Sequence, residues 1–270
     1  MNFSTAIFAF GTRSTDELKS LRNGDKSWET YFDDVYEVDP PDGYSVHNAL
    51  DGKVHDLRPI LGRRGSTSII YVPTRAQVDR EEPGRARLRV RDYLPQSESA
   101  IAIGFIGSHD RSYAHGHVII PRRAILSEDL RTTLKRSFDE ESTGGYTDGE
   151  IRGALYTLCK RNDLAAHLVD ATFTVTDEAE TLRQNSHRLL ELGYAGRDME
   201  LAWFLSFANQ HSKPAGAMLV VSDTIKEDGR HEDPFGDPAR GQELFTVPEI
   251  AKESTRKVLH IATRHALDRN

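Results

Sequence analysis

Apolar residues occur along this chain in short runs that are separated by polar segments. The longest runs lie around residues 100–106 and 215–221 and have about seven residues each, a length typical of buried strands. From about residue 100 onward, strand-like runs alternate with segments in which apolar residues recur at helical spacing. This alternation predicts an α/β fold in which helices flank a central mixed sheet.

The elements expected after residue 98 follow the same alternation. Strands are predicted at residues 99–108, 117–125, 171–176, 194–197 and 216–222, with the second broken at Pro121, and helices at 149–162, 178–192, 199–211 and 248–269. Asp177 is placed to cap the second helix and Gly193 to end it. Residues 139–148 are expected to form a loop, and the segment 223–241 is long enough to be a candidate lid.

The first 98 residues are less regular. Strands are predicted at residues 6–10 and 68–74, a capped helix at 14–21, and a long loop at 39–65. We expect one domain over residues 1–270, with a recognisable core at 99–270. The divergent part at 1–98 either contributes to the sheet of that core or decorates it.

Composition narrows the class of protein. The net charge is −7, from 35 basic and 42 acidic residues, which argues against a nucleic-acid partner. No apolar run approaches the ~20 residues of a membrane span, and we expect no signal peptide and a cytoplasmic location. Cys159 is the only cysteine, which excludes a disulfide framework. The histidines lack metal-site spacing, so we expect neither a metal nor a cofactor.

Two carboxylates follow predicted strands at positions where α/β enzymes bind ligands. Glu200 comes after the short strand at 194–197, at the start of a helix, and Asp223 follows the apolar strand at 216–222. Ligands in this fold class bind outside the carboxyl ends of strands, so both are candidate site residues. The alternative is structural, because the helix dipole also favours an acidic residue in a first turn.

Four segments carry a resemblance to a known family. They are GFIGS at 104–108, HGHVIIPRRAI at 115–125, RDMELAWF at 197–204 and GAMLVVSD at 216–223. Their order and intervals resemble the nucleoside phosphorylase family, which includes purine nucleoside phosphorylases, methylthioadenosine nucleosidases and AMP nucleosidases. The resemblance runs from about residue 99 to the carboxyl terminus.

The resemblance implies a role for each matching residue. Asp223 would be the general acid at N7 of a purine, a role that needs a raised pKa. Glu200 would accept hydrogen bonds from the ribose 2′ and 3′ hydroxyls, and Met199 would pack beneath the sugar. Ser222 is more simply a residue that shapes the strand end. The remaining matches are the turn residues Gly104 and Gly107.

Departures from the family pattern favour hydrolysis. Phosphorylases of this family carry Ser or Thr after the first glycine of the turn, where it helps to hold inorganic phosphate, and Phe105 stands there. Leu219 replaces the arginine of methylthioadenosine nucleosidases, and AMP nucleosidases are also apolar at that position. The resemblance therefore implies a nucleosidase that releases adenine from AMP or ATP. A compact enzyme of this kind also resembles antiphage effectors that destroy adenine nucleotides.

Further candidates rest on shorter similarities. The stretches GYSVHNAL at 43–50 and SIIYVPTRAQVD at 68–79 resemble AMP nucleosidases and make His47 and Arg75 candidates for the sugar 5′ side, with a subunit interface as one place for that contact. Arg122 and Arg123 are further candidate donors to a 5′-phosphate, and Phe173 is a candidate for stacking on the base. A loop histidine, surface arginines and a core phenylalanine are the structural alternatives.

Three functions remain open at this point. The first is the adenine-nucleotide nucleosidase, the second a purine nucleoside phosphorylase that uses inorganic phosphate, and the third a catalytically silent nucleotide-binding module. In each case the expected partner is a small-molecule nucleotide. The family resemblance also implies a homo-oligomer, either a dimer or a hexamer.

Overall fold

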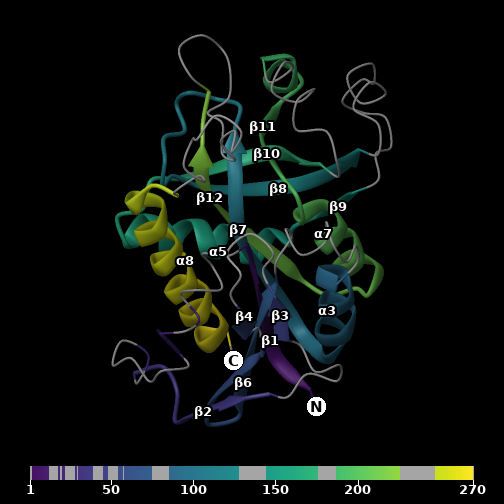
Figure 1. Ribbon diagram of the computed structural model, residues 1–270, viewed down its shortest axis with the longest axis vertical. Coiled ribbons are helices and arrows are strands. Elements are labelled where there is room, and N and C mark those ends of the chain that lie inside the picture. The colour runs from purple at the N-terminus through teal and green to yellow at the C-terminus, as the bar shows by residue number, and fades with distance from the viewer. Residues whose placement is uncertain are drawn as a thin grey trace.

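The computed structural model describes residues 2–11, 18, 20–21, 28, 30–38, 45–47, 54–56, 58–74, 85–127, 144–175, 187–225 and 247–269. Ten strands in this part of the chain form one mixed sheet, with the order β11-β10-β8-β12-β7-β1-β6-β5-β2 and with β9 beside β8 (Figure 1). Their bounds are β1 Phe3–Phe10, β2 Asp34–Glu37, β5 Ile60–Arg64, β6 Thr67–Thr74, β7 Ser97–Ser108, β8 Val118–Ser127, β9 Gly144–Tyr146, β10 Ala166–Val175, β11 Tyr194–Asp198 and β12 Ala215–Asp223. Two short strands, β3 Ser45–His47 and β4 Val54–Asp56, pair only with each other.

The sheet closes on itself at one end. Besides β10, β11 also pairs with β7, so that β7, β12, β8, β10 and β11 form a ring. The strands β6, β1, β7 and β12 run parallel to one another, and their carboxyl ends therefore share one edge. In the ring, that edge meets the carboxyl-terminal half of β11.

Helices cover both faces of the sheet. They are α3 Arg85–Tyr93, α5 Gly149–Arg161, α7 Leu201–Gln210 and α8 Glu249–Asp268, and a short 3-10 helix, η2 Leu94–Gln96, follows α3. Side chains alternate along β1: Ile7 packs in the cluster that contains α5 and α8, and Phe8 in the cluster that contains α3 and α7. This period of two is expected for a strand buried on both faces. Figure 1 shows α8 and α5 on one side and α7 and α3 on the other.

These features confirm the predicted α/β class with a central mixed sheet. The first 98 residues contribute to that sheet through β1, β2, β5 and β6. Gly193 has a φ of 83° at the end of the helical segment before β11, as its expected role required. Of the helix expected at 14–21, positions 18, 20 and 21 are helical. The candidate lid at 223–241 lies largely outside the described residues.

Two expectations were wrong. Residues 39–65 are not one long loop, because they include β5, which joins β6 through a hairpin turn at Gly65, where φ is +56°. Pro121 does not break its strand. The pairing of β8 with β12 ends at Ile119, and the pairing with β9 begins at Arg123, so the missing N–H of Pro121 falls between the two ladders.

The strand β9 was also unexpected. Gly144 and Gly145 lie in it, although the sequence predicted a loop there. A Cβ atom on Gly144 would lie 2.2 Å from the carbonyl oxygen of Ala124, and one on Gly145 would lie 2.3 Å from the backbone carbon of Leu205. The two glycines thus allow β9 to fit between β8 and α7. Among the described residues, no helix is long and apolar enough to cross a membrane.

Candidate active site

Three strands meet at Gly107, near the end of β7. Gly107 pairs with Arg197 of β11 on one side and with Asp223 of β12 on the other. A Cβ atom on Gly107 would lie 2.6 Å from Oδ2 of Asp223, so the carboxylate occupies the space that a side chain would take. The absence of a side chain at Gly107 leaves room for Asp223 to approach Arg197.

Asp223 is buried, and its carboxylate contacts the side chains of Arg197 and Ser222. Nη2 of Arg197 lies 3.2 Å from Oδ2 of Asp223, and the exposed fractions of the two side chains are 12% and 7%. The Ser222 hydroxyl donates to Oδ1 at 2.9 Å. Neighbouring residues of a regular strand point to opposite faces, but a bulge between Val221 and Asp223 breaks this alternation. Bulges of this kind redirect side chains near active sites.

This arrangement stabilises a negative charge on Asp223 and places a positive charge beside it. An ion pair with little solvent around it is stronger than one at the surface, and hydrogen bonds to a charged group add to it. Together Asp223 and Arg197 present a buried acceptor and a buried donor at the carboxyl ends of β7 and β12. Such a pair can bind a heterocycle that has a donor and an acceptor on adjacent atoms.

The second candidate carboxylate lies on the turn from β11 to α7. Glu200 follows Arg197 by three residues and is the N-cap residue of α7, but its side chain makes no capping hydrogen bond. Asp198 takes that role, because its Oδ1 accepts from the backbone N–H groups of Glu200 at 3.0 Å and Leu201 at 2.7 Å. Met199 is 39% exposed. The turn therefore presents Met199 and Glu200 close in sequence to Arg197, at the same end of β11.

Asp198 is buried and has a perturbed pKa. Its exposed fraction is 4%, and burial raises its pKa to about 6, against the lowering effect of the Leu201 N–H, Thr174, the Glu200 N–H and Thr172. Thr174 of β10 donates to Oδ1 of Asp198 at 2.8 Å. This carboxyl group is thus held within the protein rather than presented to solvent.

Gly104 and Phe105 lie earlier in β7. A Cβ atom on Gly104 would meet Leu219 and Phe10 at 3.4 Å, so Gly104 faces core side chains. Phe105 is partly buried, and its ring approaches Gly11, at the end of β1, where a Cβ atom would lie 3.4 Å from Cδ2. The edge where β1 and β7 end therefore has an aromatic ring at the position where the resemblance expects a phosphate-binding hydroxyl.

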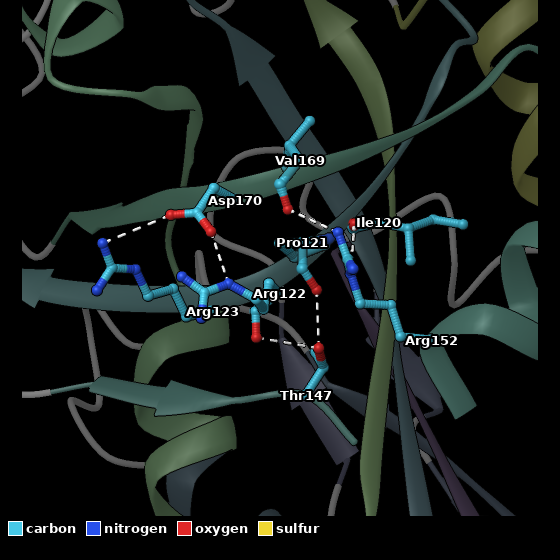
Figure 2. Close-up of polar contacts among 8 residues, drawn as sticks. All are labelled: Ile120, Pro121, Arg122, Arg123, Thr147, Arg152, Val169 and Asp170. Atoms are coloured by element: carbon cyan, nitrogen blue, oxygen red, sulfur yellow. Dashed lines mark hydrogen bonds and ion pairs between the residues drawn. The ribbon is translucent and has the colours of Figure 1, made fainter. Parts of the chain in front are cut away.

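Arg122 and Arg123 contact a different carboxylate. Nε of Arg122 donates to Oδ1 of Asp170 at 2.6 Å, and Nη2 of Arg123 lies 3.5 Å from Oδ2 (Figure 2). The Arg122 guanidinium holds the pKa of Asp170 below its usual range. Val118, at the start of β8, pairs with Val220 of β12, and the two strands run antiparallel. Arg122 and Arg123 come later in β8 and therefore lie farther from Asp223.

The other candidates lie apart from Asp223 or beyond the described part of the chain. Phe173 is 1% exposed, and its ring meets that of Tyr194 edge-on at 5.5 Å between centroids, which is the packing of a core side chain. His47 lies in β3, and only its backbone is described. Arg75 lies outside the described residues, directly after β6. No cluster of three or more potential metal ligands occurs within the described ranges.

Sequence reasoning missed Arg197, Asp198 and Thr174. Arg197 and Asp198 stand directly before Met199 and Glu200, and an aspartate just before a helix is a common capping signal. That signal was available for Asp198. The contact of Arg197 with Asp223 depends on the closure of the sheet between β11 and β7, for which the sequence contains no local signal.

Three solved structures show what this fold is similar to. The P knowlesi homolog of P falciparum PNP has a TM-score of 0.59 at 12% identity, over 98% of this chain and 90% of its own. Purine nucleoside phosphorylase from Toxoplasma gondii, in complex with immucillin-H, has a TM-score of 0.60 at 14% identity, over 100% and 93%. Campylobacter jejuni 5′-methylthioadenosine/S-adenosyl homocysteine nucleosidase has a TM-score of 0.64 at 13% identity, over 97% and 100%. At these identities the likeness is one of fold.

The family is shown by sequence. No curated protein matches the chain significantly, but the family model described as the phosphorylase superfamily matches residues 88–261, more than half of the chain. That range includes Gly107, Arg197, Glu200 and Asp223. The resemblance in the four sequence segments is thereby confirmed, and the chain belongs to the phosphorylase superfamily, whose enzymes transfer or hydrolyse the glycosyl group of nucleosides.

Proposed function

We propose that this protein is a nucleosidase that hydrolyses the N-glycosidic bond of adenine nucleotides, AMP or ATP, to adenine and a ribose phosphate. The observation that carries the proposal is the buried Asp223 carboxylate, held by Arg197 and Ser222 over Gly107. Glu200 lies three residues after Arg197, on the turn that begins α7. In this proposal, Asp223 serves the base and Glu200 serves the sugar.

The chemistry requires charge stabilisation at both ends of the breaking bond. When the bond between C1′ and N9 breaks, its electron pair passes to the purine and positive charge develops on the ribosyl ring. Asp223 takes up a proton from solvent and delivers it to N7, and the Arg197 guanidinium stabilises the carboxylate that remains after the transfer. Glu200 accepts hydrogen bonds from the ribose hydroxyls and so holds the sugar in place. A water molecule then adds its oxygen to C1′ and loses a proton to solvent.

Phe105 supports water rather than phosphate as the nucleophile. Its ring packs beside Gly11, where β1 ends, on the edge shared with β7. A phenylalanine ring provides no donor for an anion, whereas a serine or threonine hydroxyl does. Phosphorolysis would need a replacement donor at this edge.

The 5′-phosphate requires a cationic partner, and we propose Arg75. Residue 75 directly follows β6, which runs parallel to β1 and ends at the same edge as β7 and β12. Arg122 and Arg123 already contact Asp170. His47 remains a candidate for the same end of the sugar.

A product assay tests this function. The protein is incubated with AMP, ATP and adenosine, with and without inorganic phosphate, and the products are identified by chromatography. We expect adenine and ribose phosphates from the nucleotides, in equal yield with and without phosphate. Release that requires phosphate would instead support a purine nucleoside phosphorylase, and nucleotide binding without any release would support a silent binding module.

Two variants make the assay specific to the site. Asp223→Asn is expected to lower base release by ~10²–10⁴-fold, because it removes general acid catalysis. Asp170→Asn is the matched control, since Asp170 is also an arginine-paired aspartate but lies on β10 and is partly exposed. Equal losses in the two variants would contradict the assignment of Asp223.

Assembly and biological role complete the proposal. We propose a cytoplasmic homo-oligomer of even subunit number, because closed symmetric assemblies are the usual form of soluble enzymes. We also propose that depletion of adenine nucleotides serves antiphage defence. Light scattering that shows an active monomer would overturn the first claim, and a phage challenge in which Asp223→Asn protects cells as well as the native chain would overturn the second.

A further inference from the structure

The start of α7 is anchored by side chains from two neighbouring strands. Asp198 ends β11 and pairs in register with Thr174 of β10. Oδ1 of Asp198 accepts from the N–H groups of Glu200 and Leu201 at 3.0 and 2.7 Å. The Thr174 hydroxyl donates to Oδ1 of Asp198 at 2.8 Å and accepts from the N–H of Ala202, also at 2.8 Å. These contacts satisfy three successive N–H groups at the helix start, which need partners outside the helix.

The anchored segment is the one that would bind ribose. Met199 and Glu200 lie between Asp198 and Leu201. The N–H groups of Glu200 and Leu201 both donate to Asp198, and these hydrogen bonds hold the backbone of the segment. The side chain of Glu200 takes no part in capping the helix. Asp198 performs the capping instead, so the backbone at Glu200 is held by a side chain other than its own.

Solvent cannot replace these contacts. Asp198 and Thr174 are both buried, at 4% and 0% exposure. Thr172, two residues before Thr174 on β10, is also buried and lowers the pKa of Asp198, whereas Phe173, between them, packs in a separate apolar cluster. One face of β10 is thus polar at this point because it meets Asp198.

We propose that Asp198 and Thr174 are positioning residues that hold Met199 and Glu200 in place for the ribose. This inference rests on the proposed function, because it assigns Glu200 to the sugar hydroxyls. The pair acts through the backbone of the segment and contacts no substrate. Displacing a substrate-binding group by about 1 Å can lower a rate by ~10²-fold, so loss of the pair should impair catalysis without removing a group that touches the substrate.

Conservative and disruptive variants separate positioning from general stability. Thr174→Val keeps the shape of the side chain but loses the hydroxyl, and Thr174→Ser keeps the hydroxyl. Asp198→Asn keeps an acceptor oxygen, and Asp198→Ala removes it. Thr255→Val is the matched control, because Thr255 is equally buried and donates to Ala251 within α8.

Kinetics with AMP and 2′-deoxy-AMP then measure the contact between Glu200 and the sugar. The native enzyme is expected to prefer AMP, and Thr174→Val and Asp198→Ala should lower kcat/KM for AMP by ~10–10²-fold, with a smaller effect on 2′-deoxy-AMP. Their preference for AMP should fall to that of Glu200→Ala. Thr174→Ser and Asp198→Asn should retain the preference for AMP over 2′-deoxy-AMP. In the double variant, adding Thr174→Val to Glu200→Ala should reduce this preference no further than Glu200→Ala alone does.

A structural readout accompanies the kinetics. Hydrogen exchange at the amides of residues 200–202 should accelerate in Thr174→Val while the amides of β12 keep their protection. Thr255→Val should change neither this exchange nor the preference for AMP. If Thr174→Val loses activity equally on both substrates, or keeps its preference while the exchange accelerates, the positioning role is wrong.

The two proposals can fail separately. A native enzyme that releases no base from any nucleotide overturns the proposed function and the catalytic part of this inference. Hydrogen exchange still decides whether the pair holds the segment, because it needs no turnover. A native enzyme that releases base from both substrates equally overturns the assignment of Glu200 and leaves the nucleosidase proposal standing.

Discussion

Gly107 is a position in β7 where the site leaves no room for a side chain. A Cβ atom there would lie 2.6 Å from Oδ2 and 3.1 Å from Cγ of Asp223, and real Cβ atoms essentially never approach a neighbour within 3.0 Å. In Gly107→Ala the carboxylate must therefore move by at least about 0.4 Å. The same oxygen makes the 3.2 Å contact with Arg197, so moving it disturbs that contact.

The size of the effect follows from the packing around the carboxylate. Adding a methyl group to a packed interior costs about 1–3 kcal/mol of unfolding free energy, and each kcal/mol lowers Tm by about 2–4 °C in a chain of this size. Base release should fall on the order of 10–10²-fold, because the displaced group contacts the reacting base in the proposed mechanism. Differential scanning calorimetry and release of adenine from AMP measure the two effects.

Gly104→Ala is the matched control, since it adds the same methyl group to the same strand. There the new Cβ atom would meet Leu219 and Phe10 at 3.4 Å, an ordinary contact distance. We expect Gly104→Ala to lower both Tm and base release by less than Gly107→Ala does. A Gly107→Ala enzyme with native Tm and native rate would refute the argument that the carboxylate occupies this space.

Three further predictions follow from the described side chains. Arg197→Met removes the cation beside the buried Asp223 and should cost up to about 3–5 kcal/mol in urea unfolding, a loss that adding Asp223→Asn should partly restore. His117 and His167 share a 3.0 Å contact, and burial lowers both pKa values. Because the unfolded chain then binds more protons, the unfolding free energy should decrease as pH falls below about 6.5, and less so in His167→Gln. Burial raises the pKa of Cys159 to about 12, so a thiol reagent at pH 8 should label it only after denaturant is added.

The strand pattern of this chain could be predicted because each strand is a continuous apolar run. The runs at 99–108 and 216–222 became β7 and β12 almost residue for residue, since strands buried on both faces need apolar side chains throughout. The helix at 149–162 was equally clear, because its apolar residues recur at helical spacing and share one buried face. The stretch 39–65 is rich in Gly, Pro and His, which predicts a loop, although residues 60–64 form β5 of a hairpin.

Asp223 and Glu200 could be selected from the sequence because each follows a strand. Arg197 could not, because its partner lies 26 residues later in the chain and the two meet only through the pairing of β7 with both β11 and β12. Phe173 illustrates the converse. An aromatic residue in a strand fits a stacking role or a core role equally well by pattern, and only its burial against Tyr194 separates the two.

Two irregularities in the sheet explain why the polar side chains of this site converge. The pairing of β12 with β7 shifts between Val221 and Asp223, and the pairing of β10 with β11 shifts between Ala171 and Phe173. The first shift lets Ser222 and Asp223 form a hydrogen bond although they are neighbours in one strand. At the second shift, Thr172 lies within reach of the Asp198 carboxyl group. A bulge depends on which strands pair and in what register, so the chemistry at Asp223 and the support at Asp198 both depend on pairings between strands that are distant in the chain.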